Sequence, residues 1–380
     1  MNNAFDFQKT YFLKAQSPMI HFQYNATGAC LRATEVKPKL DRFLIRKFRQ
    51  QKIDFSAWRC SKDHEALDYQ MTLKAGTDHR GSLTINNFRI YYGNMGNNAT
   101  KDIIFRDCSM NIICFNHELR VQIDKYIGEF FIVTNFGTMQ DKGFGSFLVD
   151  GRNSSQSYIS ECLRNEYRAQ KCYTFSAGDA VTAFKRIKSV YALMKSGINL
   201  PHRGYSRSLL FDYMHYEIKE NGKEISIGNE KAWLKQRQIA PALGRRTNQH
   251  DNRSYYVRAL LGIGDHVEFL DRHDKTKVSI KEDPVQGEVT LERFPSPILF
   301  KVIGDAVYYV GQRIHPDIYD KRFLFQSPMG QGYLSTPPLS LVKENFIDDF
   351  LDYCYYWFTD PDESPLAIFD DTQNISITEV

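Results

Sequence analysis

Three absences limit what this 380-residue sequence can encode. No apolar run approaches the roughly 18 residues that a membrane helix needs, so we expect no membrane partner. The first ten residues contain no basic segment followed by an apolar one, so no secretory signal is predicted. The seven cysteines are scattered without a Cys-x-x-Cys pair. This pattern favours reduced thiols and a cytoplasmic location over a disulfide framework or a zinc site.

Metal-ligand and nucleotide-binding motifs are also missing. His64, His79 and His117 stand apart from one another without paired carboxylates, so no metal is predicted. No glycine-rich turn is followed by Gly-Lys-Ser/Thr, and none opens a helix in the manner of a dinucleotide fingerprint. We therefore predict no cofactor.

The charge of the chain is divided unevenly. The whole sequence has a net charge of +4, and residues 341–380 carry ten acidic and one basic side chain. This tail therefore has a charge of −9, which leaves +13 for residues 1–340. A basic body favours a polyanionic partner, and an acidic tail could shield that body or bind a neighbouring subunit. Ordinary solvated faces are the alternative interpretation.

A glycine-rich stretch, FFIVTNFGTMQDKGFGSF (130–147), is the most distinctive segment. The apolar run 130–133 is predicted to be a strand that leads into Gly137, and Gly143, Phe144 and Gly145 follow a polar tip that ends in Lys142. Successive N–H groups in such a turn can form an anion-binding nest, which Lys142 would reinforce. The alternative is a plain hairpin loop after a strand.

Residues 31–51 contain the best predicted helix of the first half, and Pro38 suggests a start near Lys37. Its apolar positions fall on one face. Four cations recur roughly opposite at helical spacing and could follow a phosphate backbone, or simply face solvent: Lys39, Arg42, Arg46 and Arg49.

The other segments are assigned by their patterns. Residues 10–24, 69–75, 88–93, 103–115, 119–123 and 208–218 are predicted to be strands, 179–195 a helix and 289–311 a hairpin. Residues 321–339 are expected to be an irregular loop, and 341–358 an acidic helix followed by a segment, 359–380, that contributes little to the core. Basic residues interleave with aromatic ones over 231–258, a pattern typical of single-stranded nucleic acid binding or of an ordinary core.

These motifs together resemble the RAMP superfamily of CRISPR-associated proteins. The resemblance is carried by Ser17-Pro18 in the first strand, Leu31-Arg32 at the helix, the loop from Gly137 to Ser146, and Arg293-Phe294-Pro295-Ser296-Pro297. It implies an α+β fold with a ferredoxin-like (RRM-like) antiparallel sheet, helices on one face, and either large insertions or a second RAMP-like unit. The implied division is a first domain over 1–150 that ends in the loop, a basic second part over 151–340, and an acidic helix and tail over 341–380.

The resemblance also implies a function. The chain is expected to be a non-catalytic RNA-binding subunit of a CRISPR effector ribonucleoprotein. Its expected partners are guide RNA and other effector subunits, with target nucleic acid as a further candidate. The predicted RNA-binding residues come from the loop, the first helix and two later basic stretches: Gly137, Lys142, Gly143, Phe144, Gly145, Arg32, Lys39, Arg42, Arg46, Arg49, Arg203, Arg207, Arg245 and Arg246.

Two alternatives remain at this stage. A metal-independent endoribonuclease that trims guide-RNA precursor would need a general acid or base near the loop, and His21 is the best candidate. A histidine beside Phe22 is also common as a structural residue. A protein-binding scaffold without nucleic acid is favoured only by the acidic tail, and copurifying RNA would argue against it.

Overall fold

The computed structural model describes most of the chain: residues 7–20, 30–61, 65–79, 83–84, 102–103, 105–200, 204–220, 222–240, 253–270, 275–283, 294–360, 364, 366 and 375–380. Residues 88–93, which were predicted to be a strand, lie outside these ranges.

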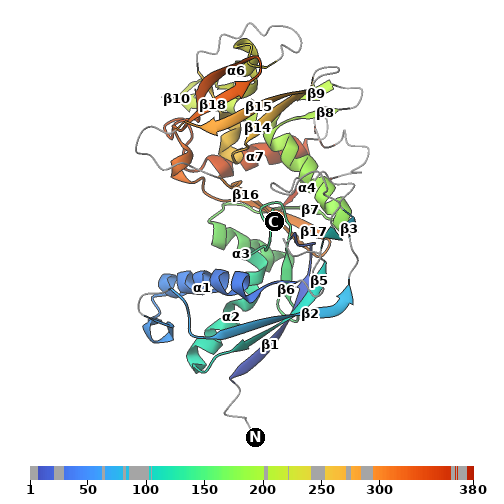
Figure 1. Ribbon diagram of the computed structural model, residues 1–380, viewed down its shortest axis with the longest axis vertical. Coiled ribbons are helices and arrows are strands. Elements are labelled where there is room, and N and C mark those ends of the chain that lie inside the picture. The colour runs from blue at the N-terminus through green and yellow to red at the C-terminus, as the bar shows by residue number, and fades with distance from the viewer. Residues whose placement is uncertain are drawn as a thin grey trace.

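The first half forms a four-stranded antiparallel sheet with two helices on one face (Figure 1). Its strand order, β2-β5-β1-β6, and its βαββαβ succession are those of the ferredoxin-like fold, as predicted. The elements are β1 (Gln8–Ala15), α1 (Ala33–Gln50), β2 (Gln70–His79), β5 (Arg106–Ile113), α2 (His117–Val133) and β6 (Phe147–Val149), with a short pair, β3 (Leu83–Thr84) and β4 (Asp102–Ile103), between β2 and β5 in sequence.

Side-chain periodicity explains why these segments form a two-layer unit. From Thr10 to Ala15, the odd-numbered residues of β1 are buried and the even-numbered ones are exposed, which is the period of a strand with one face covered. In α1, Leu40, Leu44 and Phe48 are fully buried, at the helical spacing of four. The core therefore lies between this face of the sheet and the two helices.

The second half repeats the same succession around a second antiparallel sheet with strand order β16-β17-β7-β20. α3 (Gln156–Tyr167) connects the two units. The second unit consists of β7 (Tyr173–Ser176), α4 (Ala180–Lys195), β16 (Ile298–Ile303), β17 (Ala306–Gly311), α7 (Phe346–Thr359) and β20 (Thr378–Glu379). The fold thus has both features that were expected as alternatives, a second ferredoxin-like unit and large insertions.

The insertions follow α4 and β17, and they build a third antiparallel sheet, β14-β15-β18-β19, at the end of the molecule far from the first sheet (Figure 1). Their elements are β8 (Ile198–Leu200), β9 (Gly204–Ser206), α5 (Leu209–Tyr216), β10 (Lys219–Glu220), β11 (Lys223–Glu224), β12 (Gly228–Asn229), α6 (Glu230–Gln236), β13 (Ser254–Tyr255), β14 (His266–Leu270), β15 (Lys275–Glu282), β18 (Arg322–Ser327) and β19 (Gly330–Ser335), with 3₁₀ turns at Val257–Leu261 and Pro316–Ile318, and another at Ser56–Trp58 in the first unit.

The second sheet is buried on both faces. Phe300 and Val302 of β16 belong to the core that contains α4 and α7. Leu299 and Ile303, which alternate with them, belong to the core of the first unit. This is why β16 reads as a continuous apolar run, whereas β1 alternates. The two ferredoxin-like units are therefore joined through the second sheet.

Several details differ from the sequence-based predictions. Residues 119–123 and 130–133 lie in α2, and 208–218 contains α5, so the strands predicted there are wrong. Tertiary packing of their apolar residues overrides the strand preference of the aromatic and β-branched side chains. The expected loop at 321–339 contains the β18–β19 hairpin, and α1 begins at Ala33, about one turn before Lys37.

The C-terminal residues complete the second sheet, which overturns the expectation that 359–380 contributes little to the core. β20 pairs antiparallel with β7, and the N–H of Val380 donates to the carbonyl of Cys172 at 2.9 Å. Ile375 and Ile377 are buried. Because most residues of this segment are polar, the sequence did not show that the two isoleucines are buried.

Deleting Ile375–Val380 is therefore expected to lower the free energy of unfolding by about 3–5 kcal/mol, because two isoleucines and an edge strand would be lost. Chemical denaturation of the purified protein measures this. The control is Glu379→Ala, which removes only a solvent-exposed ion pair with Lys171 and should cost under about 1 kcal/mol. An unchanged unfolding curve after the deletion would show that β20 does not stabilise the sheet.

Candidate nucleic-acid interface

The glycine-rich loop follows α2 and lies where the two ferredoxin-like units meet. The Ser17 hydroxyl donates to the carbonyl of Gly143 at 2.6 Å and accepts from the N–H of Ser146 at 2.9 Å. The N–H of Gly145 donates to the carbonyl of Pro18 at 2.8 Å. From the other unit, the N–H of Phe300 donates to the carbonyl of Asp141 at 3.0 Å. The Ser-Pro segment and the loop therefore form one hydrogen-bonded structure.

The tip of the loop is packed rather than open. Gly143 and Gly145 have φ values of +84° and +71°, and a Cβ on Gly145 would lie 1.9 Å from the carbonyl oxygen of Phe136. Phe144 is buried and stacks on Phe184 of α4, with 4.0 Å between ring centroids. These residues join the two units. That they also contact RNA stays a prediction.

The start of the loop already binds an anion from the protein. The N–H of Gly137 donates to the Glu35 carboxylate at 2.8 Å, and Lys39 contacts the same carboxylate at 3.2 Å. Lys39 also donates to the carbonyl of Asn135 at 3.0 Å and to the side chain of Gln140 at 2.9 Å. Burial lowers the pKa of Lys39. Lys39 therefore connects α1 to the loop.

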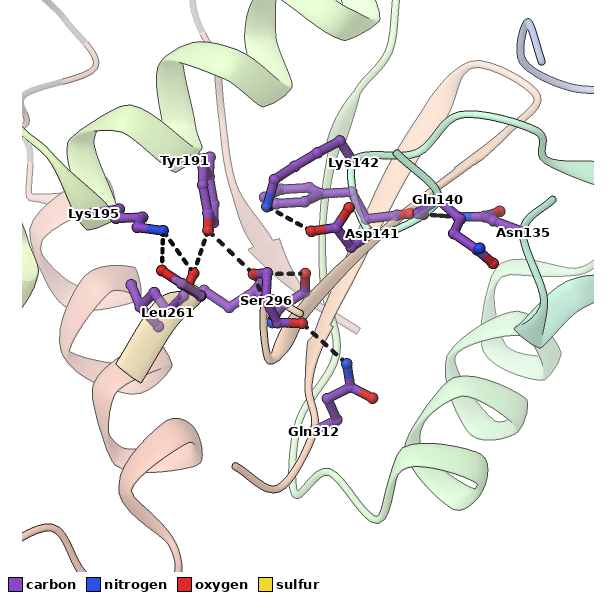
Figure 2. Close-up of polar contacts among 12 residues, drawn as sticks. Asn135, Gln140, Asp141, Lys142, Tyr191, Lys195, Leu261, Ser296 and Gln312 are labelled. Carbon is purple, nitrogen blue, oxygen red and sulfur yellow. Dashed lines mark hydrogen bonds and ion pairs between the residues drawn. The ribbon is translucent and has the colours of Figure 1, made fainter. Parts of the chain in front are cut away.

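Lys142 is enclosed beside a tyrosine. Its Nζ lies 3.2 Å from the centre of the Tyr191 ring and 3.2 Å from the Asp141 carboxylate (Figure 2). The Tyr191 hydroxyl donates to the carbonyl of Leu261 at 2.6 Å, and Lys195 donates to the same carbonyl at 3.0 Å. Burial raises the pKa of Tyr191, but the charges of Lys195 and Lys142 and side-chain hydrogen bonding act in the opposite direction, and the net shift is downward.

A groove of about 700 Å³ opens beside this contact between α1, the loop and the second unit. Cations from α1 and amide side chains from the loop and from the residue after β17 line it: Lys39, Arg42, Arg46, Asn135, Gln140 and Gln312. Asp141 and Glu166 also line it. We call this site the α1 groove; it offers cations and hydrogen-bond donors, the groups that bind phosphate and ribose.

The predicted stripe of cations on α1 is largely paired. Arg46 forms an ion pair with Glu166, and Arg49 forms one with Glu65. Arg42 is exposed at the groove, and no ion pair joins it to an acidic side chain in the described ranges. The sequence therefore placed the cations correctly along one helix face but could not show which of them are neutralised.

The structure describes two of the remaining predicted residues, and neither lines the α1 groove. Arg32 is half-buried at the start of α1, outside the α1 groove, and Arg207 pairs with Asp212 at 3.1 Å. His21, Arg203, Arg245 and Arg246 lie outside the described residues.

Part of the aromatic and basic pattern of 231–258 is buried, in a core and in an ion pair. Trp233 and Tyr256 pack in the core of the third sheet. Arg258 pairs with the fully buried Glu230. For these three residues the pattern reflects packing, which was the alternative interpretation, whereas Arg237 and Arg253 are exposed.

Sequence reasoning missed several residues that shape the site, namely Asn135, Lys195 and Gln312. The one available signal was the position of Asn135, a polar residue two positions after the apolar run 130–133. The structure buries it to 3% exposure. In the part of the chain that the structure describes, no three metal-ligating side chains cluster. No helix there is long and apolar enough to span a membrane.

Comparison with known proteins identifies the family. A model of the Cmr1 N-terminal domain matches residues 7–198, and a model of the Cmr1 C-terminal domain matches residues 205–372. The chain belongs to the Cmr1 family. This confirms the RAMP-type CRISPR assignment made from the sequence motifs. Cmr1-family membership indicates a subunit of a type III CRISPR effector complex.

Among solved structures, the chain is similar to the crystal structure of Cmr1 from Pyrococcus furiosus in its apo form. The identity is 8%, the match covers 98% of each chain, and the TM-score is 0.41. No curated protein matches the chain.

Proposed function

We propose that this Cmr1-family chain is a non-catalytic subunit that binds the backbone of guide RNA in a type III CRISPR effector ribonucleoprotein. The observation that carries the proposal is the α1 groove, where the exposed Arg42 stands beside several amide side chains. The charge of +13 on residues 1–340 supports a polyanionic partner.

The groove suits a sugar–phosphate backbone better than a base. Arg42 presents a planar guanidinium that can bind a phosphate through two donors. Asn135 and Gln140 are tied to backbone carbonyls, because the Asn135 amide donates to the carbonyl of Gln140 at 2.6 Å and the Gln140 amide to that of Gly137 at 3.2 Å. Such a fixed polar wall positions a strand without reading its sequence.

Arg46 and Lys39 would contribute less than Arg42. Arg46 is half exposed and already paired with Glu166, and Lys39 holds Glu35 and the loop. An RNA phosphate would have to compete with these internal carboxylates, and each carboxylate left nearby would repel it. We therefore expect one dominant phosphate contact in the groove.

Arg42→Ala is expected to weaken binding of single-stranded RNA by the purified protein and to reduce the slope of log Kd against log salt by about one, as the loss of one phosphate contact requires. Fluorescence anisotropy with one labelled oligonucleotide over a salt series gives both quantities.

The matched control is Arg49→Ala on the same helix. Arg49 is exposed, pairs with Glu65 and does not line the α1 groove. Its loss should change affinity and salt slope little. Equal effects of the two variants would indicate a diffuse field rather than a site in the groove, and an affinity of the wild type that does not depend on salt would contradict the proposal.

A further inference from the structure

The outer face of the first sheet carries an exposed aromatic ring in the middle of a flat polar surface. Phe12 on the central strand β1 is 64% exposed. In the strand register it lies opposite Ser109 on β5, which lies opposite Lys74 on β2. These three residues therefore form one row across the sheet, on the face opposite to α1 and α2.

The row is well spaced for a nucleotide. Neighbouring strands are about 4.8 Å apart, so the backbone positions of Phe12 and Lys74 are separated by roughly 10 Å. The row beside it holds only small polar side chains, because Thr10 lies opposite Asn111, which lies opposite Thr72. A planar ring with a cation at this distance, next to a row of small polar side chains, can hold a base and its phosphate together.

The cations of this face are available. Lys74 is exposed, and in the described part of the chain it forms no ion pair. Lys14, two residues beyond Phe12 on the same face, pairs with Asp150 at 2.6 Å, but both side chains are 47% exposed. Ion pairs this open to solvent are weak, so a phosphate can replace Asp150.

The equivalent face of the second sheet cannot play this role. Leu299 and Tyr308 on that face are buried in the core of the first unit. The first sheet has no such cover among the described residues, as the exposure of alternate residues of β1 shows. Of the two ferredoxin-like sheets, only the first therefore leaves one face exposed among the described residues.

We propose that the outer face of the first sheet binds single-stranded RNA, with one base stacked on Phe12 and the adjacent phosphates bound by Lys74 and Lys14. The proposal rests on the proposed function and adds a second, base-contacting surface to it. A single strand is required because only unpaired bases present a free ring face to an aromatic side chain. A protein partner fits less well, since the row offers one ring beside two lysines rather than a cluster of apolar anchors.

The test compares Phe12→Ala, Phe12→Trp and Tyr356→Ala. Tyr356 is a matched control, because it is 63% exposed on α7, a helix of the second unit. The probes are a labelled oligouridylate and an RNA duplex of equal length. Phe12→Ala should raise the Kd for the oligouridylate roughly 5- to 100-fold, with no change for the duplex or in melting temperature. Phe12→Trp should retain binding, and Tyr356→Ala should have no effect.

Each other outcome is decisive. If Phe12→Ala leaves the affinity for oligouridylate unchanged while Arg42→Ala lowers it, the stacking surface is excluded and the α1 groove remains. The same holds if Phe12→Ala alters only the capture of another effector subunit. If the wild type binds neither RNA, the proposed function itself fails. A parallel loss for single strand and duplex would assign Phe12 a role in folding or in electrostatics rather than in stacking.

Discussion

Gly145→Ala is expected to prevent the loop from adopting its structure and to lower the free energy of unfolding by more than about 4 kcal/mol. The new methyl group would lie 1.9 Å from the carbonyl oxygen of Phe136. That oxygen cannot move away easily, because the N–H of Phe136 donates to the carbonyl of Gly145 at 3.0 Å, which holds the two backbones together. The residue also has a φ of +71°, which an alanine adopts only with strain.

Gly151→Ala separates the steric clash at Gly145 from the backbone strain of a positive φ. Gly151 has a φ of +72°, nearly the same as Gly145, and a Cβ there would meet nothing within 4 Å. It should therefore show only the backbone strain, on the order of 1–2 kcal/mol. Denaturant unfolding of both variants gives the comparison. Similar losses in the two would mean that the close approach at Gly145 relaxes at little cost.

This result would also decide between the two interpretations of the loop that the sequence left open. If the loop is a phosphate nest, its glycine variants should still fold but bind RNA more weakly. If the loop is packed, the same variants should lose stability first. The contacts of Gly143, Phe144 and Gly145 favour the second outcome. RNA affinity should then be measured only on variants that still melt cooperatively.

The sequence predicted the fold better than the site, for a physical reason. The alternation of β1 and the apolar spacing of α1 depend on neighbours in sequence, so periodicity reveals them. The loop depends on partners far away: Ser17 contacts Gly143 across 126 positions, and Ser146 donates to the carbonyl of Val302 across 156. A local pattern of glycines cannot show what lies against them.

The charge pattern of α1 has the same limit, because it shows where cations lie along the helix but not which acidic residues pair with them. Helical spacing placed Arg42, Arg46 and Arg49 on one stripe, which the structure confirms, but their acidic partners come from elsewhere. Glu166 belongs to α3, and Glu65 lies in the segment before β2. Only the folded chain shows that Arg42 is the one of these three without an ion pair among the described residues.

The second large effect is expected at Lys301, a lysine in the second sheet that is completely buried. Its Nζ donates to the carbonyls of Phe131 and Thr134, both at 2.8 Å, at the C-terminal end of α2 in the first unit. These are among the carbonyls that a helix leaves without an intrahelical partner. One side chain thus connects the two units.

Lys301→Ala should cost about 3–5 kcal/mol, since it leaves a cavity and two buried carbonyls without a donor. Lys301→Met keeps most of the volume and should cost about 1–3 kcal/mol for the carbonyls alone. The control is Lys188→Met, at an exposed position of α4, where little change is expected. If the alanine variant is as stable as the wild type, Lys301 does not link the units.

The pH dependence of the methionine variant tests the charge of this lysine. Burial, with a smaller effect of the Lys39 charge, lowers the pKa of Lys301 well below its usual value. In the unfolded chain the pKa returns to about 10.4. Between the two values the unfolded state binds more protons than the folded state, so the stability contributed by Lys301 rises with pH over that window.

The difference in unfolding free energy between wild type and Lys301→Met should therefore be larger at pH 10 than at pH 7. A difference that shrinks with rising pH would mean that the buried lysine is held in its charged form by the carbonyls of α2.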